Sequence, residues 1–158
     1  MEMHNYLLKK DIVSKQLKKT LYLYVWISRK RRFILQQLYL HPTWEKAISD
    51  KDRALIESVF EQTYDQVDDV IMSPVIRVAF NHKKELLVTA LVHNFTHHGT
   101  RFRNRSVYIR CDEYMEEQLF TIPELNIPPF TSMPWTFIFE PKTEHASLDL
   151  QQLILEIE

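Results

Sequence analysis

Three histidines lie close together in the second half of the chain, at His93, His97 and His98. Neutral imidazole is a common zinc ligand, so these residues could serve a metal-dependent hydrolase. The residues around His93 alternate as in a strand, however, and this pattern places His93 on one face with Leu91 and Phe95. We therefore expect a structural role for His93 and no metal or other cofactor. The three histidines are kept as an alternative set of ligands.

A basic stretch follows these histidines. In an extended backbone Arg101, Arg103 and Arg105 share one face, which turns apolar beyond them, and Phe102 lies on the opposite face. Guanidinium groups beside an aromatic ring hold phosphate groups and stack on bases. Arginine and aromatic residues also anchor protein interfaces. This stretch is therefore the main candidate binding site, and nucleic acid is one candidate partner for it.

A second basic run consists of Arg29, Lys30, Arg31 and Arg32. Consecutive residues wind around a helix axis, so such a run is usually a solvated turn. Beside the arginine stretch at residues 101–105, it would instead extend a surface that contacts phosphates.

Aromatic residues gather in the proline-rich stretch from Ile122 to Pro141, which holds Trp135 and Phe137. Prolines flank these residues, and proline within a sheet is largely confined to edge strands. We expect an edge that pairs with a strand of a protein partner or of a second copy of the chain. The alternative is a wrapping segment that covers the sheet or the helices. The binding residues indicated by these patterns are His97, His98, Arg101, Phe102, Arg103, Arg105, Arg29, Arg31, Arg32, Trp135 and Phe137.

Enzymatic chemistry finds little support. Gly99 is the only glycine, which excludes glycine-rich loops that cradle phosphate and the glycine-flanked serine of hydrolases. Cys111 precedes Asp112 and Glu113, whose negative charge disfavours a reactive thiolate. We therefore expect no enzyme and assign no catalytic residues. Gly99 itself is expected to release the chain into a turn before the arginines.

The composition fits one soluble domain of 158 residues, because 45% of the residues are hydrophobic and 12% are aromatic. The 20 Lys and Arg balance 21 Asp and Glu, so any nucleic-acid or membrane partner would need a local patch. The first residues lack the pattern of a secretory signal, and the longest apolar run, Leu21 to Ile27, is too short to span a bilayer. We expect a cytoplasmic protein without a membrane partner.

Helical spacing dominates the first half of the chain. Ser49 is a good N-cap, and the apolar residues after it predict a helix from about Asp50 to Val70. Residues 5–40 fit one long helix or two shorter ones. His41 and Pro42 are expected to end this helical stretch, because the residue before a proline avoids the α region.

The period changes to two after Ser73. Alternation predicts strands at residues 75–80, 85–95, 106–111 and 135–140. Residues 147–158 fit either a helix or a strand.

These elements predict an α+β fold in which N-terminal helices pack on an antiparallel sheet or small β-barrel, followed by a short C-terminal element. Residues 1–158 would form a single domain, with residues 1–72 mainly helical, 74–140 antiparallel β and 141–158 the C-terminal element. The expected function is that of a non-enzymatic binding or regulatory protein that acts through a protein partner. The alternatives are a nucleic-acid-binding accessory protein that uses the Arg101–Arg105 loop, and a metal-dependent hydrolase based on the histidines.

Overall fold

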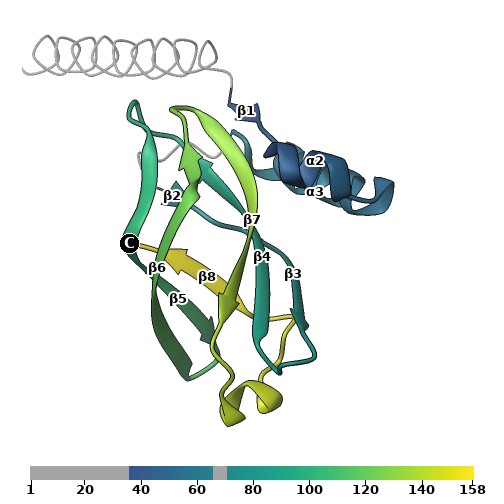
Figure 1. Cartoon of the computed structure of the whole chain (residues 1–158), viewed down its shortest axis with the longest axis vertical. Coiled ribbons are helices and arrows are strands. Elements are labelled where there is room, and N and C mark those ends of the chain that lie inside the picture. Colours follow the sequence, from purple (N-terminus) through teal and green to yellow (C-terminus); the bar gives the residue numbers. More distant parts are fainter. Residues whose placement is uncertain (1–35, 66–70) are drawn as a thin grey trace, which may run out of the picture. The chain divides into compact units, whose positions relative to one another are not determined.

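The computed structural model describes residues 36–65 and 71–158 (Figure 1). Strands make up 49% of these residues and form two sheets. The prediction of an α+β fold with helices packed on a sheet is therefore wrong, and the protein is mostly β. The helical stretch expected over residues 5–40 is wrong at residues 36–40, where strand β1 (Gln37–Leu38) lies instead. Its remainder, with Arg29, Arg31 and Arg32, lies outside the described residues.

Two helices follow the first short strand, α2 (Pro42–Ala47) and α3 (Asp50–Thr63). Pro42 begins α2 rather than ending a helix, because proline is tolerated at the first helical position, where the backbone N–H has no partner. Ser49 caps α3 as predicted, with Oγ accepting from the backbone N–H of Asp52 at 3.1 Å. The helix ends at Thr63, short of the predicted Val70. None of the helices in the described residues is long and apolar enough to cross a membrane.

The larger sheet has the order β1-β7-β4-β2, and β3 also pairs with β4. The expected strand at residues 75–80 is confirmed, and the expected strands at 85–95 and 135–140 correspond to β4 and β7. The bounds are β1 Gln37–Leu38, β2 Ile71–Met72, β3 Val75–Phe80, β4 Leu86–Asn94 and β7 Thr131–Phe139.

The smaller sheet has the order β6-β5-β8, formed by β5 (Thr100–Cys111), β6 (Tyr114–Ile127) and β8 (Ile154–Ile157). The 3₁₀ helix η1 (Thr143–Ser147) lies between β7 and β8 in the chain. Strand β6 was not predicted from the sequence. Its last residues belong to the proline-rich stretch that was expected to form an edge or a wrapping segment. The C-terminal residues fitted either a helix or a strand, and they form a strand.

The core lies between the two sheets. Every member comes from a strand or from the C-terminal segment, which is why the helices do not form a layer of the fold. Within the two helices only Ile56 is buried, at 2% exposure. The core residues are Leu86, Val88, Ala90, Val92, Phe102, Val107, Ile109, Leu125, Ile127, Met133, Phe137, Phe139, Leu153 and Leu155.

The single glycine does not supply the positive φ that tight turns need. Gly99 has no positive φ, although the chain bends at residues 96–98 directly before it, and among the described residues four others have a positive φ. They are Lys84, Asn104, Asp112 and Phe130, with φ between 47° and 61°. Left-handed backbone is strained for residues with a Cβ, so the turns of this fold depend on their surroundings to hold them.

Candidate functional site

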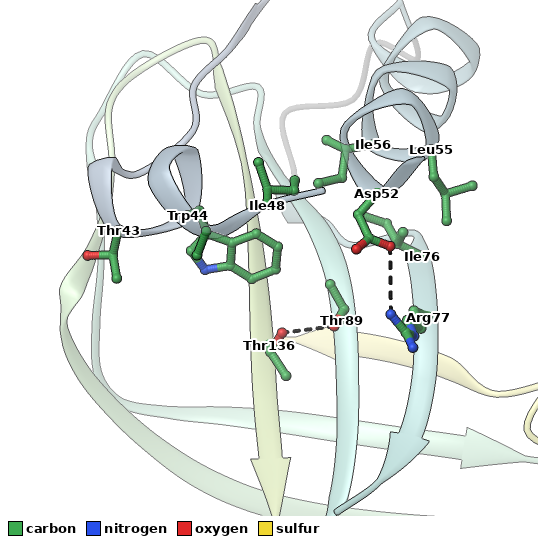
Figure 2. Close-up of a pocket in the computed structure, with 11 residues that line it drawn as sticks. Thr43, Trp44, Ile48, Asp52, Leu55, Ile56, Ile76, Arg77, Thr89 and Thr136 are labelled. Carbon is green, nitrogen blue, oxygen red and sulfur yellow. Dashed lines mark hydrogen bonds and ion pairs between the residues drawn. The ribbon is translucent and has the colours of Figure 1, made fainter. Parts of the chain in front are cut away.

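A groove of about 380 Å³ opens between the two helices and the outer face of the larger sheet (Figure 2). Its walls are mostly apolar and come from both layers. The lining residues are Thr43, Trp44, Ala47, Ile48, Asp52, Leu55, Ile56, Ile76, Arg77, Thr89 and Thr136.

Strand register builds the floor of this groove. Thr89 of β4 is paired with Arg77 of β3 on one side and with Thr136 of β7 on the other. The hydroxyls of Thr89 and Thr136 lie 2.8 Å apart and hydrogen-bond to each other (Figure 2). Each threonine therefore satisfies its neighbour, and the floor presents methyl groups and backbone to the groove.

Helical spacing builds the opposite wall. Asp52, Leu55 and Ile56 are three and four residues apart in α3, so they share one face of the helix. Asp52 meets Arg77 at 3.6 Å across the groove, and both side chains are exposed, so this ion pair adds little stability. Leu55 is 42% exposed, which leaves a large apolar side chain open to a ligand.

The groove lies beside a strand edge. β1 covers β7 only at Thr131 and Ser132, where Tyr39 N–H donates to the Ser132 carbonyl at 2.9 Å. Alternation along β7 turns the backbone groups of Pro134, Thr136 and Ile138 toward the same side. After Tyr39 the chain leaves the strand and enters α2, so no strand in the described part of the chain continues this pairing. We refer to these backbone groups of Pro134, Thr136 and Ile138 as the open edge.

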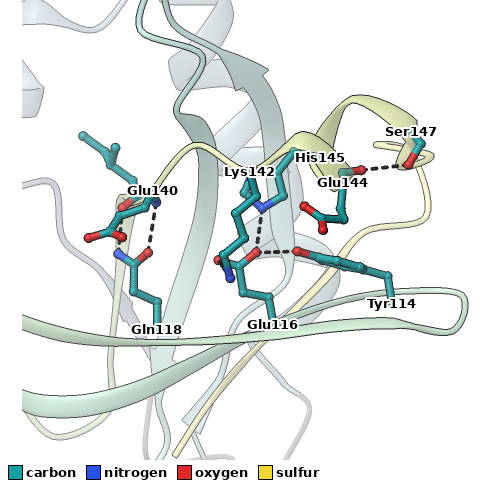
Figure 3. Close-up of polar contacts among 9 residues, drawn as sticks. Tyr114, Glu116, Gln118, Glu140, Lys142, Glu144, His145 and Ser147 are labelled. Atoms are coloured by element: carbon teal, nitrogen blue, oxygen red, sulfur yellow. Dashed lines mark hydrogen bonds and ion pairs between the residues drawn. The ribbon is translucent and has the colours of Figure 1, made fainter.

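One side chain ends the open edge. The amide of Gln118 donates to the Ile138 carbonyl at 3.1 Å and accepts from the Glu140 N–H at 3.0 Å. Figure 3 shows the Gln118 amide beside the backbone of Glu140. These two bonds are the ones that a neighbouring strand would make. Among the described residues, the groups of this edge that remain without a partner are therefore the Pro134 carbonyl, the Thr136 N–H and carbonyl, and the Ile138 N–H.

His93 is a fully buried residue of β4 with both ring nitrogens engaged. Thr63 Oγ1 donates to the Val59 carbonyl at 2.7 Å, so it accepts from His93 Nε2 at 2.8 Å. His93 Nδ1 then accepts from the Ser132 hydroxyl at 2.7 Å. Burial lowers the pKa of His93 to about 4, which keeps the ring neutral at pH 7.

A buried carboxylate holds η1 against β6 (Figure 3). Glu116 accepts from His145 Nε2 at 2.6 Å and from the Tyr114 hydroxyl at 2.7 Å, and its other oxygen lies 3.0 Å from Lys142 Nζ. Burial alone would raise the pKa of Glu116, but these donors outweigh it and the pKa lies below its usual value. Nδ1 of His145 is buried without a partner in the described residues.

The expected binding residues are not gathered in one place. Phe102 and Phe137 belong to the core and are 1% and 0% exposed. Trp135 is half-buried, with its ring centroid 6.2 Å from that of His41. The two exposed histidines differ in their surroundings, because the ring of His97 packs edge-on against Phe130 while the His98 carbonyl accepts from Asn94.

The arginines of β5 are on its surface: Arg101 and Arg103 are exposed and Arg105 is half-buried. Irregular register between Phe102 and Arg105 breaks the expected alternation. Phe102 is therefore buried in the core with Val107, whereas Arg101 and Arg103 are exposed. Within the described residues no group of three His, Cys, Asp or Glu side chains could hold a metal ion.

The groove itself was missed at the level of sequence. Its residues come from four segments of ordinary apolar and hydroxyl composition, so no local spacing marks them. The one usable signal was Pro42, which fits the first position of a helix that carries Trp44, and it was interpreted as a helix end.

Residues 36–65 and 71–158 form a mostly β domain in which an apolar groove lies beside a strand edge that no other described strand covers. A family model described as the SLAP domain matches residues 38–157. This match covers most of the chain, and the protein belongs to the SLAP domain family. No curated protein and no solved structure matches the chain significantly.

Proposed function

We propose that this protein is a non-enzymatic binding module that holds an extended segment of a protein partner against the open edge of β7. The observation that carries the proposal is the position of this edge directly beside the groove, since Thr136 belongs to both. The setting of this activity would be the cytoplasm, where the buried thiol of Cys111 stays reduced.

Strand addition suits both parts of the site. The free N–H and C=O groups of the edge would supply backbone hydrogen bonds to any extended segment. Side chains of an added strand alternate between its two faces, so every second one would enter the groove against Trp44, Ile48 and Leu55. The expected ligand is therefore a segment with apolar residues at alternate positions.

The limited length of the edge supports a specific partner over general aggregation. Pro134 offers no N–H, and Gln118 occupies the groups at the far end. Natural proteins shorten exposed edges in these ways to avoid unspecific pairing. The part left open is long enough for only a few backbone bonds, so the groove would have to add specificity.

A single backbone donor tests this proposal. Thr136→Pro removes the edge N–H without touching the ladder to β4, because that N–H points away from β4. Thr136→Val is the matched control, since it keeps the N–H and loses only the hydroxyl. Affinity capture from the native host after nuclease treatment should recover the same partner proteins with wild type and Thr136→Val, and lose them with Thr136→Pro.

A second variant tests the groove. Leu55→Asp places a charge on an exposed position that the core does not use, and it should also abolish capture. Equal recovery by Thr136→Pro, by Leu55→Asp and by wild type would refute the proposal. Recovery that disappears after nuclease treatment would support the nucleic-acid alternative instead.

A further inference from the structure

A second cavity, of about 550 Å³, opens in the smaller sheet where β5 and β6 separate. Arg101 is paired with Asn126 while the next residue, Phe102, is paired with Ile122, so β6 bulges at residues 123–125. The pairing then steps from Phe102 to Arg105 while β6 advances only to Phe120, so β5 bulges at residues 103–104. Two bulges facing each other produce the opening.

The charged groups that line this cavity are two guanidinium groups. Arg101 and Arg103 line it, with Asn104, Thr121 and Asn126, and no carboxylate does. Within the described residues, Arg101, Arg103 and Arg105 form no ion pair.

The charge of the surrounding sequence makes this cluster unusual. Residues 36–158 hold 11 Lys and Arg against 19 Asp and Glu, a formal net charge of −8. Unpaired arginines at one cavity of an acidic unit mark a local site for an anion.

The walls of the cavity decide between two anionic partners. Single-stranded nucleic acid is held by stacking of bases on exposed aromatic rings. The only aromatic residue that lines the cavity is Phe102, and it is 1% exposed. The half-buried Ile122 and the exposed Pro123 supply an aliphatic wall instead. These contacts suit a peptide in which an acidic side chain lies next to an aliphatic one.

We propose that this cavity binds an acidic peptide segment, with Arg101 and Arg103 holding its carboxylates. Arginine binds carboxylate through two parallel hydrogen bonds, which gives geometric selectivity as well as affinity. Asn104 and Asn126 stand at the same cavity and offer amide groups to the peptide backbone. This cavity is in a different sheet from the open edge. A test of the cavity is therefore independent of the function proposed above.

The test uses the full chain labelled with ¹⁵N and three probes: acetyl-Ala-Glu-Leu-Glu-Ala-amide, the same peptide with Gln for Glu, and a single-stranded decathymidylate. Titrations followed by NMR should give a Kd at least about tenfold lower for the acidic peptide than for its glutamine form, as expected for one charge-assisted pair. Shifts should concentrate at residues 101–104 and 121–126.

Two variants localise the binding. Arg101→Gln combined with Arg103→Gln should weaken the acidic peptide by about tenfold or more. Arg110→Gln is the matched control on the same strand, because Arg110 is exposed and already paired with Glu156 at 3.1 Å, and it should leave Kd nearly unchanged. Equal affinity for both peptides, equal loss in both variants, or tighter binding of the decathymidylate would each overturn the proposal.

Discussion

At the scale of single residues, the directions of the hydrogen bonds around His93 determine its tautomer. Gln36 donates to the Ser132 hydroxyl at 3.0 Å, Ser132 donates to His93, and His93 donates to Thr63. Each hydroxyl accepts one hydrogen bond and donates the next one, so only the neutral tautomer with the proton on Nε2 fits. Protonation would turn the Nδ1 acceptor into a second donor facing Ser132 and break this order.

This buried ring makes stability depend on pH. The pKa of His93 is about 4 in the folded protein, against 6.5 as its ordinary value. Below pH 6.5 His93 therefore binds a proton in the unfolded chain but not in the folded one. The free energy of unfolding falls with pH until the pH nears 4. The full loss corresponds to about 3 kcal/mol.

Urea unfolding at a series of pH values measures this effect. Between pH 6.5 and 5 the midpoint for wild type should fall more steeply than that for His93→Gln, whose amide cannot titrate. Parallel slopes for the two proteins would mean that His93 is not the group responsible.

At the scale of elements, Glu116 ties η1 to β6. Replacing it with Gln keeps the size of the side chain but gives His145 and Tyr114 an amide in place of a charged acceptor. We expect Glu116→Gln to lower the free energy of unfolding by about 3 kcal/mol, because a buried charged hydrogen-bond centre is lost. Tyr114→Phe removes one donor only and should cost about 1 kcal/mol.

Chemical denaturation gives both values, and amide hydrogen exchange locates the change. In Glu116→Gln the amides of η1 and β8 should exchange faster than those of β4, which lies in the other sheet. A cost no larger than that of Tyr114→Phe would contradict the anchoring role of the carboxylate.

The elements also show what a sequence can and cannot reveal. β3 and β4 were predictable because two apolar runs, rich in β-branched residues, flank the polar turn at residues 81–84, and α3 because Ser49 and the apolar spacing mark it. β6 was not, since its bulge at residues 123–125 and the exposed Met115 and Leu119 destroy the alternation. Phe102 was misplaced for the same reason, because one extra residue in β5 reverses which face is buried.

The groove could not be predicted from the sequence, for a different reason. It depends on α2 and α3 meeting Thr89 and Thr136, and that contact is set by tertiary packing that no local pattern records. The cavity between β5 and β6 was predictable only in part. The sequence indicated its arginines, but no pattern indicated the bulges that form the opening.

At the scale of the whole molecule, we expect the length of the open edge of β7 to determine how strongly copies of the protein associate. Gln118→Ala uncovers the Ile138 carbonyl and the Glu140 N–H, which lengthens the open edge. We expect this variant to self-associate more strongly than wild type, because a longer unpaired edge templates strand pairing between copies.

Light scattering coupled to size-exclusion chromatography, over a series of protein concentrations, measures this change. Gln118→Ala should show a higher average mass that rises with concentration. Adding Thr136→Pro to the same chain should bring the mass back toward that of wild type. Identical masses for Gln118→Ala and wild type would show that Gln118 does not protect the edge.

The order of strands in the chain has a kinetic consequence. β4 and β7 are neighbours in the larger sheet, yet the whole β5–β6 hairpin lies between them in sequence. Their pairing must wait for a long loop to close, and such non-local pairing is slow, typically milliseconds to seconds. The β5–β6 hairpin is joined by a two-residue turn and needs no such closure. If it forms first, it shortens the effective loop, so the hairpin that carries the arginine cavity would also set the rate at which the other sheet assembles.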